Sequence, residues 1–412
     1  MKSSTVRAMI AVIALLSAAS QAGTPGSADL VRARNLVFGA EHVDQRTGQV
    51  DRQQIIFSWL TNATLAASIK GRVVLLDTFV HRAETVPGRT PFVVEDLVSL
   101  APEVAFIGHG HGDHADNAAW LAAKTGMVLF ASDETCTELR ADAVRLVGTG
   151  ALTSSTIDCR SVTSFGSHPG AELVQINFLE PLVSITAFRH LHSGTSYPES
   201  GEPNPFPITP VKNIADPRDP DMYPPGTPHS YPTRGPVGGP ISIYYHFVVH
   251  GQNEFTFAWH NTTGDLHHGC TIDHQPPACW DDLYPAEHIS ERVKARIAAL
   301  SETDLEFGSF VSLGYAVNGM RDPIENSAVL KPKVYVPIHQ TNAALPTSSL
   351  YFKVAYQAQL EQMIPALTPE QRPEARWMVD PDDYLKPMVY DPSDSRWRKR
   401  NQGHDGARGD DR

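Results

Sequence analysis

The chain has 412 residues, 41% of them hydrophobic and 19% charged, which is enough apolar material for one large globular domain or two smaller ones. Its net charge is −12 at pH 7. An acidic surface repels phosphate backbones, so this charge argues against a nucleic-acid partner.

The first residues have the three parts of a secretory signal. Lys2 and Arg7 give a positive start, residues 8–19 are apolar, and Ser20-Gln21-Ala22 is a small-residue cleavage site. An uncleaved anchor is the alternative, but the apolar run is short for a bilayer core of about 30 Å. We therefore expect residues 1–22 to be a signal peptide, and the protein to be exported to the periplasm or secreted, without stable membrane insertion.

Four cysteines are consistent with an oxidising compartment. Proximity in the sequence favours the pairs Cys136–Cys159 and Cys270–Cys279 among three possible pairings. Thiolate ligation of a metal is the alternative, but no pair has C-x-x-C spacing.

From residue 54 onward the pattern alternates between strands and helices. Residues 55–80 predict three short strands with a turn at Lys70-Gly71, and residues 95–108 predict a helix followed by a buried strand, Val104 to Ile107. Residues 117–126 predict a helix that ends at Gly126, and residues 127–132 the next strand. This alternation is typical of a layered α/β domain, which we place at residues 30–390.

Residues 198–240 interrupt the pattern with a Pro- and Gly-rich insertion that cannot form a regular helix or a central strand. It is either a disordered or surface arm or a lid over the functional site. Regular structure resumes with a hairpin at residues 241–260, an amphipathic helix at 285–300 and a strand at 333–339. Residues 391–412 are charged and poor in apolar residues, so we expect a disordered tail.

The sequence HGHGDH, residues 109–114, follows the buried strand directly. A dinucleotide-binding loop would need a third glycine where Asp113 stands, and this carboxylate would repel a pyrophosphate. His109 and His111 are two residues apart, so their rings can point to the same side, and Asp113 and His114 can reach a second ion. Imidazole and carboxylate ligands suit zinc first, with iron or manganese as alternatives.

HGHGDH matches the H-x-H-x-D-H signature, and in this respect the chain resembles the metallo-β-lactamase superfamily. The resemblance implies a four-layer αβ/βα sandwich with two divalent metal ions at one edge. It covers roughly residues 54–342. The opening strand, "FSWLTNAT", is most similar to lactonase and N-acylphosphatidylethanolamine phospholipase D-like members, although Thr61 and Asn62 replace the Gly-His pair of those proteins.

The resemblance also implies three further ligands. His192, followed by a small residue, is favoured over His190 for the first ion; Asp265, in a Thr-Gly-Asp-Leu turn, is expected to bridge both ions. His339, at the end of a late strand, completes the set. The implied first site is His109, His111 and His192, and the implied second site is Asp113, His114 and His339.

The function that follows from the resemblance is metal-dependent hydrolysis of a small ester, lactone or phosphodiester by a hydroxide between the ions. Asp113 and His114 are the expected catalytic residues, with Asp113 orienting the hydroxide. Tyr197 is either a donor to the developing oxyanion or an ordinary loop residue. The alternative function is a degenerate, non-catalytic metal-binding protein that acts through its surface. A serine hydrolase is disfavoured because the chain has no G-x-S-x-G element.

Overall fold

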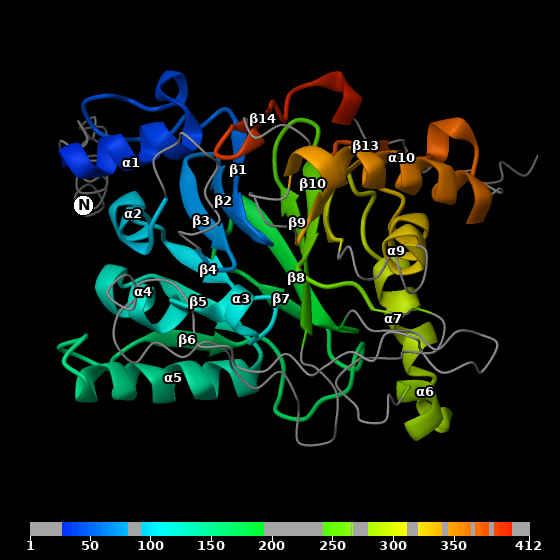
Figure 1. The fold of residues 1–412 in the computed structure, drawn as a ribbon, viewed down its shortest axis with the longest axis horizontal. Coiled ribbons are helices and arrows are strands. Elements are labelled where there is room, and N and C mark those ends of the chain that lie inside the picture. Colours follow the sequence, from blue (N-terminus) through cyan, green and yellow to red (C-terminus); the bar gives the residue numbers. More distant parts are fainter. Residues whose placement is uncertain are drawn as a thin grey trace, which may run out of the picture.

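The computed structural model describes residues 27–80, 92–192, 242–264, 266, 279–310, 320–339, 345–363, 367–378 and 383–397. These residues form two seven-stranded β-sheets that pack face to face, with helices on both outer faces (Figure 1). The predicted signal peptide and the Pro/Gly-rich insertion lie outside the described residues.

The first sheet is built from the N-terminal half of the chain and one late strand, in the order β14-β1-β2-β3-β4-β5-β6. Strands β3 to β6 are parallel, whereas β14, β1 and β2 are antiparallel to their neighbours. Its strands are β1 (Ile55–Thr61), β2 (Thr64–Ile69), β3 (Arg72–Leu76), β4 (Val104–Phe106), β5 (Val128–Ala131), β6 (Asp158–Ser161) and β14 (Met388–Tyr390).

The second sheet has the order β13-β12-β11-β10-β9-β8-β7, and its strands follow those of the first sheet in the chain, apart from β14. Strands β10 to β13 are parallel, and β7 to β9 form an antiparallel meander beside them. Its strands are β7 (Val174–Ile176), β8 (Val183–His190), β9 (Ser242–Val249), β10 (Phe255–His260), β11 (Leu305–Ser309), β12 (Val334–Ile338) and β13 (Glu374–Ala375).

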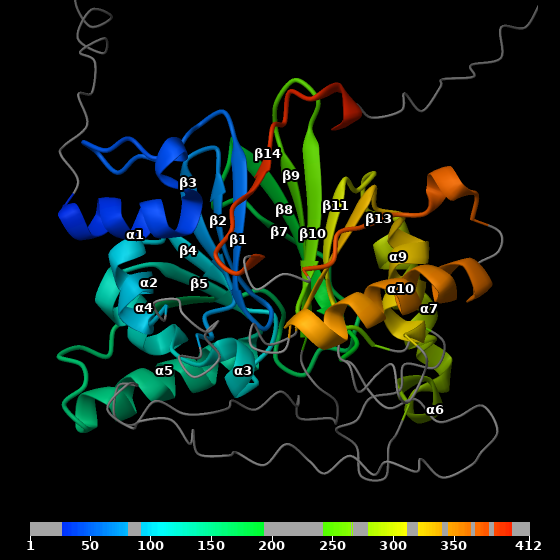
Figure 2. The same ribbon diagram turned by 45° about the horizontal axis from the view of Figure 1, so that its top comes forward.

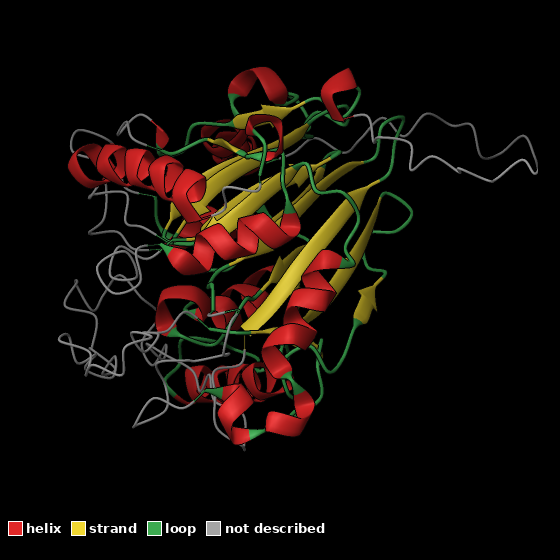
Figure 3. Ribbon diagram, turned by 90° about the vertical axis from the view of Figure 1, so that its right-hand side faces the viewer, coloured by secondary structure: helices red, strands yellow, loops and turns green. Residues whose placement is uncertain are grey.

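Helices cover each sheet on the side away from the other sheet, as Figures 2 and 3 show. The first sheet is covered by α1 (Ala28–Phe38), α2 (Val94–Leu100), α4 (Ala118–Thr125) and α5 (Asp133–Gly148). The second sheet is covered by α7 (Ile289–Ala298), α9 (Arg321–Leu330) and α10 (Leu345–Met363), with the short α6 (Trp280–Leu283) beside α7. The predicted αβ/βα sandwich is confirmed.

Strand β1 shows why its sequence is apolar on both faces. Ile55, Phe57 and Trp59 point into the core between the two sheets, whereas Ile56 and Leu60 point into the core beneath the helices. A strand inside a covered sheet is buried on both faces and therefore lacks the alternation of a half-exposed strand. The predicted turn after β2 is present, and Lys70 (φ 52°) and Gly71 (φ 85°) both have the positive φ that a tight hairpin requires.

The C-terminal segment differs from the prediction of a disordered tail beginning at residue 391. The chain is ordered through Trp397, which ends a short 3₁₀ helix, Ser395–Trp397. Trp397 is 1% exposed and packs edge-on against Phe255 at 5.0 Å between ring centroids. One large aromatic residue thus anchors a segment whose other residues are mostly polar. Residues 398–412 lie outside the described residues.

The predicted disulfide Cys136–Cys159 is confirmed, and it joins α5 to β6. Cys279 is also disulfide-bonded, and its predicted partner Cys270 lies outside the described residues. Within the part of the chain that the structure describes, no helix combines the length and the apolar character needed to cross a membrane.

Candidate metal centre

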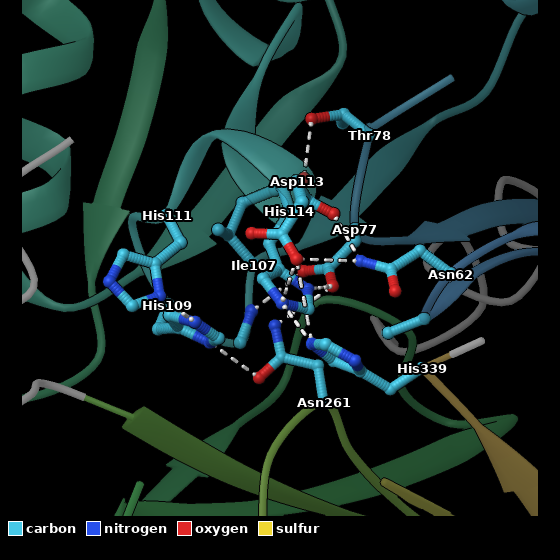
Figure 4. Close-up of polar contacts among 12 residues, drawn as sticks. Asn62, Asp77, Thr78, Ile107, His109, His111, Asp113, His114, Asn261 and His339 are labelled. Carbon is cyan, nitrogen blue, oxygen red and sulfur yellow. Dashed lines mark hydrogen bonds and ion pairs between the residues drawn. The ribbon is translucent and has the colours of Figure 1, made fainter. Parts of the chain in front are cut away.

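The candidate site lies where the carboxyl ends of strands from both sheets meet (Figure 4). β4 of the first sheet leads into residues 108–114, which include the short helix α3 (Gly112–Ala115). β8 and β12 of the second sheet lead to His192 and His339. The parallel arrangement of β3 to β6 and of β10 to β12 is the reason that residues distant in the sequence meet at one edge.

The first group of possible ligands consists of His109, His111 and His192. His109 Nε2 lies 2.9 Å from His111 Nδ1 and 3.2 Å from His192 Nε2. His109 and His192 are buried, and His111 is half-buried. Three imidazole nitrogens therefore face one point.

The second group consists of Asp113, His114 and His339. His114 Nε2 lies 3.0 Å from His339 Nε2 and 3.4 Å from Asp113 Oδ2, and His339 Nε2 lies 3.5 Å from the same carboxylate oxygen. The rings of His109 and His114 have centroids 4.1 Å apart, so the two groups are neighbours.

These spacings fit a tetrahedral divalent ion. Ligands at zinc-like bond lengths of about 2.0–2.1 Å are separated from one another by about 3.3 Å along a tetrahedron edge. The five separations run from 2.9 to 3.5 Å, so small shifts would bring each trio into coordination. Nitrogen-rich donors with one carboxylate suit zinc, iron or manganese.

Asp77 and Asn261 determine which ring nitrogens face the site. Asp77 is fully buried, and its carboxylate accepts hydrogen bonds from the Gly108 amide (3.0 Å), His114 Nδ1 (2.7 Å) and Asn261 Nδ2 (2.8 Å). The Asn261 amide must donate to this carboxylate, so its Oδ1 accepts from His109 Nδ1 at 2.8 Å. Both rings therefore carry a proton on Nδ1 and present the Nε2 lone pair to the site, an arrangement that hydrogen-bond partners commonly impose on metal-binding imidazoles.

The electrostatics of the pocket keep His109, His339 and Asp113 in metal-binding forms. Burial, together with repulsion from the neighbouring histidines, lowers the pKa of His109 well below its usual value. Burial and His114 lower the pKa of His339 to about 4. Burial alone would raise the pKa of Asp113, but the charges of His114, His339 and His111 and a hydrogen bond outweigh it and hold this pKa well below its usual range. At neutral pH His109 and His339 are neutral and the Asp113 carboxylate is ionised. His114 differs, because its burial is outweighed by the carboxylates of Asp113 and Asp77, which raise its pKa above the usual value.

Asn62, which departs from the Gly-His pair of the similar branch, contacts the site directly. Its Nδ2 donates to the backbone carbonyl of Asp113 at 2.8 Å and to Asp113 Oδ2 at 3.0 Å. Asn62, Asp77 and His339 all have positive φ values of 50°, 59° and 74°. Left-handed backbone costs a non-glycine residue on the order of 1 kcal/mol, and such residues concentrate at functional sites.

Gly108 allows the backbone to approach Asn261 closely. A Cβ atom added to Gly108 would overlap with the Asn261 carboxamide. A side chain at this position would therefore displace the group that orients His109. This contact explains why residue 108, within the histidine cluster, is a glycine.

The structure brings together six of the seven residues predicted as ligands, and the seventh, Asp265, lies outside the described residues. His192 joins the first group, whereas His190 lies apart from it and packs edge-on against Tyr244. Their role as ligands stays a prediction, as does the role of Tyr197, which is also outside the described residues.

Sequence reasoning missed Asp77, Asn261 and the contact of Asn62. Asp77 and Asn261 each follow directly after a predicted apolar strand, β3 or β10, on the side of the sheet edge where HGHGDH lies. A polar residue directly after the carboxyl end of a strand in a parallel sheet is the sequence feature that could have predicted both.

Comparison with protein-family models gave no match, and neither did comparison with curated proteins. Several solved structures are similar. Igni18, a metallo hydrolase from the archaeon Ignicoccus hospitalis, is 11% identical over 82% of this chain and 98% of that chain, with a TM-score of 0.43. CmlA, a diiron β-hydroxylase from Streptomyces venezuelae, is 10% identical over 82% of this chain and 54% of that chain, with a TM-score of 0.41.

The metallo-β-lactamase MIM-1 from Novosphingobium pentaromativorans is 13% identical over 76% of this chain and 92% of that chain, with a TM-score of 0.31. Values this low transfer no activity or substrate. The two covered sheets and the histidine-rich groups at their shared edge nevertheless give this chain the metallo-β-lactamase-like fold that HGHGDH implied.

Proposed function

We propose that this protein is an exported, dinuclear metal-dependent hydrolase that acts on a small ester, lactone or phosphodiester. The observation that carries the proposal is the pair of three-residue groups, each with ligand spacings suited to a tetrahedral ion and separated by one ring-to-ring contact. A single buried histidine is commonly structural, but six donors converging in two trios at the carboxyl edge of two sheets favour a two-metal site.

His109, His111 and His192 would hold one ion, and Asp113, His114 and His339 the other. Asp265 is proposed as the bridging ligand. Bound divalent ions would supply Lewis acidity and activate water for attack at neutral pH.

Asp113 is the residue of the site best placed to orient an attacking water. Its side chain is 46% exposed, the most accessible of the six, and the low pKa keeps it ionised. Asn62 fixes one carboxylate oxygen, so the carboxylate can accept a hydrogen bond from water in a defined direction. His114 is held from behind by Asp77, which keeps its imidazole from rotating out of the site.

Export is supported by the N-terminal signal pattern and by the Cys136–Cys159 disulfide, a bond typical of proteins outside the cytosol. The chemical class of the substrate is supported by the donor set and by the resemblance of the opening strand to the lactonase-like branch. The acidic net charge favours a small molecule over nucleic acid as the substrate.

The test is metal content per chain in four proteins: wild type, His192→Ala, His339→Ala, and His190→Ala as a matched control in the same segment. We expect two ions, one ion, one ion and two ions, respectively. Hydrolysis of ester, lactone and phosphodiester panels should be lost in the two ligand variants and retained in the control. The same metal content in the wild type and all three variants would contradict the proposed metal site. Two bound ions without any turnover would favour the non-catalytic alternative.

A further inference from the structure

Arg189, three residues before His192, has its guanidinium buried between the two sheets. Its side chain is 4% exposed, and so is that of its partner Glu134. The Arg189 Nη2 atom lies 2.8 and 2.7 Å from the two Glu134 carboxylate oxygens and 2.7 Å from the Ser164 carbonyl oxygen, and its Nε donates to Thr163 Oγ1 at 2.9 Å. We call Arg189 and these three partners the Arg189 clamp.

The clamp joins the second sheet to the first. Arg189 lies in β8 of the second sheet, whereas Glu134 lies in the first turn of α5, which covers the first sheet, and Thr163 follows β6 of the first sheet. Glu134 is itself fixed, because its Oε1 also accepts from the Gly166 amide at 2.7 Å. The disulfide Cys136–Cys159 further cross-links the two segments that hold Glu134 and Thr163.

The position of the clamp matters because His192 lies beyond the sheet ladder. β8 pairs with β9 up to His190, opposite Ser242, so the backbone of His192 is two residues past the last pair. Yet His192 Nε2 must meet His109 Nε2, which belongs to the first sheet's loop and lies 3.2 Å away. The three-histidine group therefore depends on how the end of β8 sits relative to the first sheet.

We propose that the Arg189 clamp positions His192, and through it the three-histidine group, by fixing the carboxyl end of β8 against the first sheet. This inference rests on the proposed two-metal function. A guanidinium that contacts Glu134, Thr163 and Ser164 together fixes both distance and orientation, which a lysine ammonium cannot do. Buried ion pairs are often replaceable by apolar residues without loss of stability, so the specific role of this pair is geometric.

The experiment measures zinc affinity at each group separately by competition with a chromophoric chelator. A His339→Ala background leaves the three-histidine group intact, and a His192→Ala background leaves the other group without its neighbour. Arg189→Lys, and the paired replacement Arg189→Met with Glu134→Leu, are introduced into each. We expect about 10- to 100-fold weaker zinc binding in the His339→Ala background, as for other residues that orient metal ligands, and no change in the His192→Ala background.

Thr163→Val removes only one hydrogen bond of the Arg189 clamp and replaces the Arg189 variants if those do not fold. It should weaken zinc binding by the three-histidine group by a smaller factor. Lys333→Met is the matched control. It breaks the ion pair with buried Asp304 (2.7 Å) at the opposite edge of the second sheet, so it should lower the unfolding temperature without altering zinc affinity at either group.

The outcomes separate the two ideas. Unchanged affinity of the three-histidine group in folded clamp variants overturns the clamp inference and leaves the two-metal function standing. Equal weakening of both groups also overturns it, because a general loss of packing would explain that result. A wild-type protein that binds no zinc at the three-histidine group refutes the proposed function, and the clamp inference with it.

Discussion

Replacing Asp77 with asparagine changes one buried oxygen into an NH₂ group at a point where three donors converge. The Gly108 amide, His114 Nδ1 and Asn261 Nδ2 lie 2.7–3.0 Å from the Asp77 carboxylate. A carboxamide has a single acceptor oxygen, so at least one of the three donors must face another donor.

The magnitude follows from these contacts. Losing a hydrogen bond to a charged acceptor costs about 1.5–3 kcal/mol, and leaving the buried donor unpaired costs about 1–3 kcal/mol more. We therefore expect the metal-free Asp77→Asn protein to lose about 2.5–6 kcal/mol of unfolding free energy. If the NH₂ group faces His114, the ring shifts its proton to Nε2 and loses the lone pair that faces the site, so metal affinity should fall about 10- to 100-fold.

Denaturant unfolding of the metal-free protein and zinc titration of the folded protein measure the two effects. Asp304→Asn is the matched control, because Asp304 is equally buried and accepts from Thr256 and Lys333 at 2.7–3.0 Å. It precedes β11 and so lies at the edge opposite the site. The control should lose comparable stability and keep its zinc affinity. Wild-type zinc affinity in Asp77→Asn would falsify the assignment of Asp77 as the group that orients His114.

Three further predictions concern other parts of the molecule. Gly108→Ala places a Cβ atom where the Asn261 carboxamide lies, so zinc binding should weaken. The control Gly126→Ala, whose added Cβ meets no neighbour, should leave zinc binding unchanged. Equal zinc affinity in the two variants would contradict the contact between Gly108 and Asn261. The double replacement Cys136→Ser and Cys159→Ser opens a loop with a sequence separation of 23 residues, so the unfolding free energy measured by denaturant titration should fall by about 3 kcal/mol. Reductant should lower the unfolding free energy of the wild type through this bond, and it should have no effect through this bond in the variant. Trp397→Ala removes a buried ring from the core between the sheets and should lower the unfolding free energy by about 3–5 kcal/mol. As a control, a chain that ends after Trp397 should have the unfolding free energy of the full-length protein. An unfolding free energy of Trp397→Ala equal to that of the wild type would mean that this segment is not part of the core.

The sequence predicted the fold and most of the candidate site because the strongest signals are local. His109, His111, Asp113 and His114 lie within six residues directly after a buried strand, so their meeting needs no knowledge of the tertiary structure. His192 and His339 could be proposed because the family resemblance implies a histidine after each of two later strands. The choice between His190 and His192 could not be made from spacing alone, since both lie at the end of the same strand and only the packing of β8 decides which one meets His109.

The residues that hold the ligands were not predictable in the same way. Asp77 and Asn261 contact one another and two histidines across three segments of the chain, and no spacing in the sequence predicts these contacts. In the sequence, Arg189 is an ordinary charged residue near the end of a strand, and its burial depends on Glu134, 55 residues away. Trp397 stands in a charged segment, so composition pointed to disorder, whereas the cavity that accepts the ring is formed by Phe255 and Tyr390.

Each of the two ligand groups takes side chains from segments that follow strands of both sheets: His109 and His111 with His192, and Asp113 and His114 with His339. Neither sheet alone offers a complete trio, so metal binding at these groups and docking of the two sheets would be thermodynamically linked. Free metal would raise the stability of the docked state in proportion to the logarithm of its concentration. The two sheets would therefore dock fully in the compartment where the chain first binds metal. Metal supply would then determine when this protein finishes folding.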